Sequence, residues 1–154
     1  MAGSANARSA GAASSASLAL RLLAVALGIF FVFTALGKID WLANGAILLE
    51  RFQRALPSTH PSVRWYLETI AIPGAPLFAR LVPLAEFCAG AALVIGFWPR
   101  LVAGLALFMI LNFHFIDGSY WSVEFLRSGI GLPVIGGLLA LAIGGRALPW
   151  AVKP

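Results

Sequence analysis

Residues 80–117 read RLVPLAEFCAGAALVIGFWPRLVAGLALFMILNFHFID, and this stretch decides the fold. It contains two apolar segments, 80–98 and 101–117, which meet at the turn Trp98-Pro99-Arg100. A helix that crosses a bilayer needs about 20 mainly apolar residues, and each segment approaches that length. Because so short a connection joins neighbouring antiparallel helices, the stretch predicts a hairpin of two membrane spans.

Two further apolar segments, 18–37 and 127–145, complete the predicted set of spans. Residues 1–17 are small and polar, which is typical of a flexible tail. The linker 38–79 contains apolar residues interleaved with Glu50, Arg51 and Arg54, a pattern that predicts an amphipathic helix lying in the membrane interface. The sequence therefore predicts an all-α fold, a transmembrane four-helix bundle formed by residues 18–154 with an amphipathic helical linker between the first two spans.

The composition excludes most soluble proteins. Hydrophobic residues make up 60% of the 154 residues and charged residues only 11%, against roughly 25% in an ordinary soluble domain. A chain of this length keeps too much surface to hide so many apolar side chains from water. The net charge of +5 is spread thinly and contains no basic run of the kind that binds nucleic acid. We expect the lipid bilayer and other membrane-protein subunits as partners.

Charge also predicts an orientation. Four spans place both termini and the turn around residue 99 on one face, which carries five basic residues and no acid. The opposite face carries all six acidic residues, so the positive-inside rule favours a bacterial inner-membrane protein with both termini in the cytoplasm.

Polar residues at membrane depth are functional candidates by default, because burying a charge in lipid is costly. Glu86 lies within the second span, and Lys38 ends the first. His114 and Asp117 lie three residues apart near the same membrane surface. The sequence predicts an outward-opening pocket with Glu86 and His114 as catalytic groups and with binding residues that are Lys38, Arg80, Asp117 and Trp121. Such a pocket suits the polar head of a lipid-soluble molecule such as a quinone, with His114 or Glu86 moving a proton.

A simpler interpretation stands beside this one. Lys38 and Glu86 form a structural ion pair in it, His114 hydrogen-bonds a neighbour, and Asp117 is a solvated loop charge. Metal binding is disfavoured, because His114 and Asp117 supply only two ligands. The single cysteine, Cys88, excludes an internal disulfide and a covalently attached haem. We therefore expect no covalently bound cofactor, and quinone as the diffusible one.

Spaced single residues carry a family resemblance. The first span contains Arg21, Gly28, Phe31 and Gly37-Lys38, and the second begins Arg80-Leu-Val-Pro-Leu-Ala-Glu86, followed by Gly90, Leu93, Gly96 and Arg100. This pattern resembles the DoxX/DoxD-like family of small four-helix membrane proteins. The resemblance implies that Lys38, Glu86 and Arg100 occupy the family's polar positions.

The resemblance also implies a function. Thiosulfate:quinone oxidoreductase is the activity attached to DoxD-like members, and other DoxX-like members are associated with redox-stress membrane complexes. We therefore expect a membrane subunit of a quinone-linked redox complex that is not catalytic alone. The alternative is a non-catalytic accessory or assembly subunit that docks on a larger membrane complex.

Overall fold

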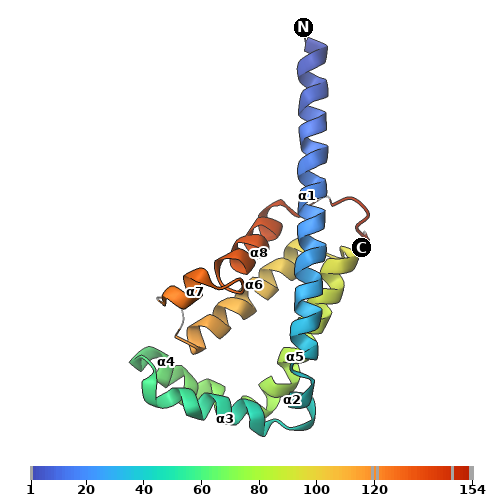
Figure 1. Ribbon diagram of the computed structural model, residues 1–154. Helices are drawn as coiled ribbons and strands as arrows, with labels where there is room; N and C mark the ends of the chain where they lie inside the picture. The colour runs from blue at the N-terminus through green and yellow to red at the C-terminus, as the bar shows by residue number, and fades with distance from the viewer. Residues whose placement is uncertain (1, 119, 121, 147, 153–154) are drawn as a thin grey trace.

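Four apolar helices form the body of the protein: α1 (Ala2–Leu36), α5 (Ala75–Ile95), α6 (Pro99–Ile116) and α8 (Leu132–Gly144). Figure 1 shows the computed structural model, which describes residues 2–118, 120, 122–146 and 148–152, with side chains from Ser14 onward except that of Ser58. Three segments are long and apolar enough to cross a membrane: Ser14–Leu36, Ala75–Ile95 and Pro99–Ile116. The all-α class and the membrane bundle predicted from the sequence agree with this arrangement.

The fourth apolar helix is shorter than the predicted span over 127–145. α8 has 13 residues, which cover about 20 Å, against about 30 Å for the hydrocarbon core. A separate short helix, α7 (Val123–Arg127), precedes it. The chain breaks between them at Gly131, where an added Cβ would clash with the Phe125 carbonyl oxygen. Pro133 then opens α8 within its first turn, where a missing N–H does least harm.

α1 also differs from its predicted bounds. It begins at Ala2, so helix continues through residues for which the sequence predicts a flexible tail. This stretch is rich in alanine, the residue with the highest intrinsic helix propensity. Its N-terminal part projects beyond the other helices in Figure 1.

The helices associate as two close pairs. α1 packs along α5, and α6 packs along α8. α5 and α6 follow each other through the turn at Gly96, whose φ of 76° is left-handed, yet they contact each other much less than either pair does. An apolar groove of about 580 Å³ opens between them, lined largely by alanines of α5 and by Val102, Leu105 and Met109 of α6. The predicted hairpin is therefore present but splayed.

The linker forms a helical layer across one end of the bundle. It contains α2 (Ile39–Ala43), α3 (Ala46–Ala55), a 3₁₀ turn (Leu56–Ser58), α4 (Pro61–Tyr66) and a π-helical turn (Leu67–Ala71). α3 is amphipathic as predicted, because Leu48 and Phe52 are buried while Arg51 and Arg54 are exposed. In Figure 1 this layer lies at the end of the bundle opposite the two termini, so both termini share one face.

Candidate functional site

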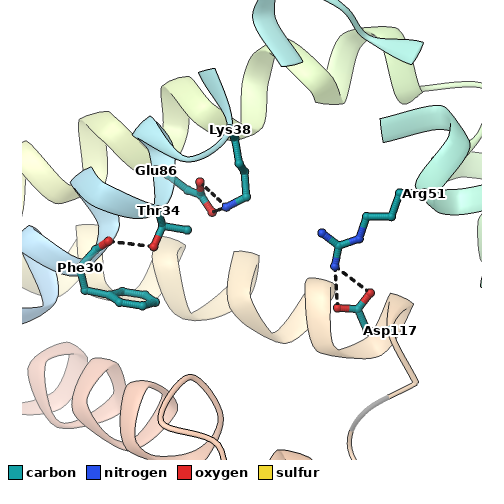
Figure 2. Close-up of polar contacts among 6 residues, drawn as sticks. All are labelled: Phe30, Thr34, Lys38, Arg51, Glu86 and Asp117. Atoms are coloured by element: carbon teal, nitrogen blue, oxygen red, sulfur yellow. Dashed lines mark hydrogen bonds and ion pairs between the residues drawn. The ribbon is translucent and has the colours of Figure 1, made fainter. Parts of the chain in front are cut away.

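A buried ion pair joins the end of the first span to the second. The Lys38 ammonium, which follows α1, lies 2.6 Å and 2.7 Å from the two carboxylate oxygens of Glu86 on α5. The Glu86 side chain is 1% exposed and that of Lys38 is 17% exposed. Figure 2 shows Lys38 reaching from the end of α1 to Glu86 on the neighbouring helix. The nearby Thr34 hydroxyl is used within α1, where it donates to the Phe30 carbonyl at 2.8 Å.

The Lys38 ammonium has hydrogen-bonding capacity that Glu86 does not use. An ammonium carries three N–H donors, and the two carboxylate oxygens account for two of them. Within the described part of the chain, no residue accepts the third. The Nζ atom lies 5.8 Å from the ring centres of both Trp41 and Phe113, a distance at which a cation is attracted to the ring face. Lys38 is thus a partly exposed donor between two aromatic rings.

His114 belongs to a different cluster. Its Nε2 lies 3.4 Å from the Ile130 carbonyl oxygen, and its ring centre lies 4.6 Å from that of Phe125. The Tyr120 ring lies beside both, and its hydroxyl donates to the Leu111 carbonyl. Desolvation by burial raises the pKa of Tyr120 above its ordinary value. His114 therefore faces α7 and the start of α8 rather than Lys38 and Glu86.

The remaining predicted residues are dispersed as well. Asp117 accepts from Arg51 of α3 at 3.0 Å and 3.1 Å, on the surface and apart from the Lys38–Glu86 pair in Figure 2. Arg80 is exposed on α5 and forms no hydrogen bond or ion pair with any described residue. Trp121 lies outside the described residues. The structure thus brings Lys38, Glu86 and Trp41 together and gives His114 and Asp117 other partners.

Sequence reasoning missed a polar contact beneath the linker. The Asn112 amide of α6 donates to the Tyr66 hydroxyl of α4 at 2.9 Å. Beside it, a cavity of about 70 Å³ lies between the linker and α6, with Phe113 in its wall. The signal was available in part, since an asparagine inside an apolar span needs a hydrogen-bonding partner. Its partner was not predictable, because Tyr66 lies in the linker.

A second contact that was missed belongs to Arg21. Its guanidinium is buried and donates to the carbonyl oxygens of Leu93 at 3.0 Å and Val94 at 2.6 Å. These are among the last carbonyls of α5, which have no partner within their own helix and carry the negative end of the helix dipole. A charged side chain therefore links α1 to α5 at each end of the helix pair, Arg21 at one end and Lys38 at the other.

We expect Arg21→Met to lower the free energy of unfolding by about 2–4 kcal/mol, because it leaves one buried and one half-buried carbonyl without a charged donor. Thermal unfolding in mild detergent, followed by helical circular dichroism, measures this loss. Arg54→Met, on the exposed face of α3, is the matched control and should unfold like the wild type. Equal stability of both variants would show that Arg21 does not stabilise the end of α5.

Within the described residues, no group of three or more His, Cys, Asp or Glu side chains is placed to hold a metal ion. The comparison with known families concerns the part of the chain that contains the Lys38–Glu86 ion pair. The DoxX family model matches residues 16–116, which is well over half of the chain and includes both Lys38 and Glu86. The chain belongs to the DoxX family. Neither the curated proteins nor the solved structures searched gave a match.

The family model matches some elements of the described structure and not others. It covers the spans of α1, α5 and α6 together with the linker, and it ends before α7 and α8. The buried ion pair therefore lies within the family domain, whereas Phe125 and Ile130, which contact His114, lie outside it. This DoxX protein is a multi-pass membrane protein in which a buried ion pair joins Lys38 to Glu86.

Proposed function

We propose that this DoxX protein is a membrane subunit of a quinone-linked redox complex, and that Lys38 binds a quinone carbonyl oxygen. The observation that carries the proposal is the third N–H of Lys38, which lies between the Trp41 and Phe113 rings and has no acceptor among the described residues. A quinone offers what this position lacks, because its carbonyl accepts a hydrogen bond and its ring stacks on aromatic faces.

The energetics of the ion pair support a functional role. Desolvating two charges costs several kcal/mol per ion, and apolar residues of similar volume often stabilise a protein as well or better. Helix pairing alone therefore does not require a carboxylate that is 1% exposed. In the proposal, quinone binding accounts for two charges that helix packing alone does not require.

The proposed chemistry assigns each group a separate task. Reduction of a quinone to a quinol takes two electrons and two protons. In the proposal a partner subunit supplies the electrons. Lys38 donates its hydrogen bond to the carbonyl oxygen, and Glu86 holds the Lys38 ammonium in place. In the proposal, protons reach the quinone from the aqueous side, and the Lys38 side chain is 17% exposed to solvent. We place the protein in the bacterial inner membrane with its acid-free face in the cytoplasm, following the positive-inside rule.

The double variant Lys38→Met/Glu86→Met tests the proposal. It removes both charges with side chains of similar length and leaves no unpaired ion. We expect the complex purified from native membranes in mild detergent to assemble with this variant and to lose quinone reduction. Arg54→Met is the control and should keep full turnover. Full turnover with the double variant would overturn the proposal.

A second candidate function rests on the α5–α6 groove. Its lining is almost wholly apolar, and Ala85, Ala89 and Ala92 on α5 are small enough for a partner helix to approach closely. In this candidate the protein is a non-catalytic accessory subunit that docks on a larger membrane complex. The same experiment separates the two, because an accessory subunit keeps turnover in the double variant and loses assembly when Ala89 is replaced by tryptophan.

A further inference from the structure

A second cavity, of about 580 Å³, lies at the opposite end of the bundle from Lys38. It is bounded by the ends of α5 and α8, the first turn of α6 and the C-terminal segment 148–152. The segment is held in place where the Val152 amide donates to the Ile95 carbonyl at 3.4 Å. No residue of the proposed quinone site lines this cavity.

Among the described residues, basic side chains line the cavity and acidic side chains do not. Arg100 and Arg146 both contribute to its wall and are exposed. Arg100 uses its Nε to donate to the Ala142 carbonyl at 3.0 Å, and the rest of its guanidinium remains available. The Arg146 side chain has no partner among the described residues. All six acids of the sequence lie between residues 40 and 124, and none of them lines the cavity.

The first turn of α6 adds to this field. Trp98, Pro99, Arg100 and Leu101 line the cavity, and they begin a helix of 18 residues. The N-terminus of such a helix carries a partial positive charge and backbone N–H groups without intrahelical partners. Two arginines and a helix N-terminus at one cavity form a site suited to a phosphate oxyanion.

The other described lining residues are mainly apolar, and they include the aromatic Trp98 and the polar Ser17 of α1. Trp98 is 47% exposed and stacks on Phe97, with ring centres 5.4 Å apart. Trp98 and Trp150 have φ angles of 41° and 56°, in the left-handed region that bulky residues occupy only at a cost. Trp98 lines the cavity, and Trp150 lies in the C-terminal segment that bounds it. Tryptophan is enriched at membrane–water interfaces, where lipid headgroups lie. The acyl chains of a lipid can pack against this apolar lining, whereas a free phosphate ion has no apolar group that could do so.

We propose that this cavity binds the phosphodiester headgroup of an anionic phospholipid. Arg100, Arg146 and the first turn of α6 bind the phosphate, and Leu101 and Trp98 contact the start of the acyl chains. Basic cavities between membrane helices bind anionic headgroups, and each nearby arginine is worth roughly a fivefold preference. The two together predict a preference of roughly 25-fold for phosphatidylglycerol over phosphatidylcholine.

Native mass spectrometry of the full chain in mild detergent tests this proposal. We expect phosphatidylglycerol adducts at concentrations where phosphatidylcholine gives none. Arg146→Gln should lower the preference roughly fivefold, and Arg100→Gln/Arg146→Gln should abolish it. The double variant Arg54→Gln/Arg64→Gln makes the same charge change at two exposed arginines of the linker, and it should retain the full preference.

Results of two kinds would overturn the proposal. One is an unchanged preference in Arg100→Gln/Arg146→Gln, or an equal loss in the linker control, which would make the effect one of net charge. The other is displacement of the lipid by millimolar inorganic phosphate, which would make this a site for free anions. Because Arg100 also contacts α8, Arg100→Lys/Arg146→Lys serves as a second variant, and it should keep most of the preference if charge is what binds.

Discussion

Replacement of Lys38 by methionine will destabilise the bundle by about 3–5 kcal/mol, because it leaves the buried Glu86 carboxylate without its only ion-pair partner among the described residues. Lys38→Met/Glu86→Met will recover most or all of that loss, since two apolar side chains of similar volume replace two desolvated charges. Unfolding of the single and double variants, followed by helical circular dichroism in mild detergent, gives the coupling energy.

We expect this loss of stability only where the broken ion pair is buried. Arg51 and Asp117 form an ion pair of comparable geometry on the surface, where both side chains are more than a third exposed. Surface pairs contribute little because water and salt screen them. Asp117→Asn is therefore the control and should leave the unfolding temperature close to that of the wild type. A Lys38→Met variant as stable as Asp117→Asn would contradict the burial of the charge.

Replacement of Gly90 by leucine will separate α1 from α5 and cost about 3 kcal/mol or more. A Cβ atom at Gly90 would lie 2.7 Å from the Gly28 carbonyl oxygen and 2.8 Å from the Val32 backbone nitrogen. Both obstacles are backbone atoms, so the clash is relieved only by moving one helix away from the other. Thermal unfolding and elution as a monodisperse species in mild detergent report the effect.

Gly104 provides the matched control for this substitution. It also lies in a membrane helix, but a Cβ there would have nothing within 4 Å. Gly104→Leu should therefore keep the fold, and it should gain up to about 1 kcal/mol from better helix propensity. If both variants unfold alike, the close approach of α1 and α5 at Gly28 and Gly90 does not hold the pair together.

The helices were predictable because lipid leaves few alternatives. In a bilayer each backbone polar group must be satisfied within the protein, so a long apolar run is helical almost by necessity. The three long spans follow this rule. The shortened α8 does not, because Phe125 of α7 packs closely against Gly131 just before α8 begins, and hydropathy does not reveal that contact. The splayed α5–α6 hairpin likewise follows from the close pairing of α1 with α5.

The polar site was predictable only in part. Lys38 and Glu86 stood out because each interrupts apolar sequence at the same end of neighbouring spans, and the structure pairs them. His114 and Asp117 share a face of α6 by spacing, yet one contacts the start of α8 and the other contacts α3. Helix periodicity gives the direction of a side chain, but the identity of its neighbour depends on tertiary packing. For Arg21 the sequence indicated a place in the family pattern and on the acid-free face but no partner, because the last carbonyls of α5 carry no sequence signature.

In the proposed function, the third N–H of Lys38 binds a quinone beside Trp41. Quenching of Trp41 fluorescence by a short-chain ubiquinone analogue tests it most directly. The reporter is the full chain in lipid nanodiscs, with every tryptophan except Trp41 replaced by phenylalanine. Trp41 is buried and lies 5.8 Å from the Lys38 Nζ, so a quinone bound there quenches it strongly.

We expect saturable quenching in the reporter and its loss in the Lys38→Met/Glu86→Met version, which stays folded by the argument above. Arg54→Met in the same reporter should quench as the parent does. Linear quenching that never saturates, or equal saturation with and without Lys38 and Glu86, would contradict the account. Saturable binding that disappears with the ion pair is the result that it predicts.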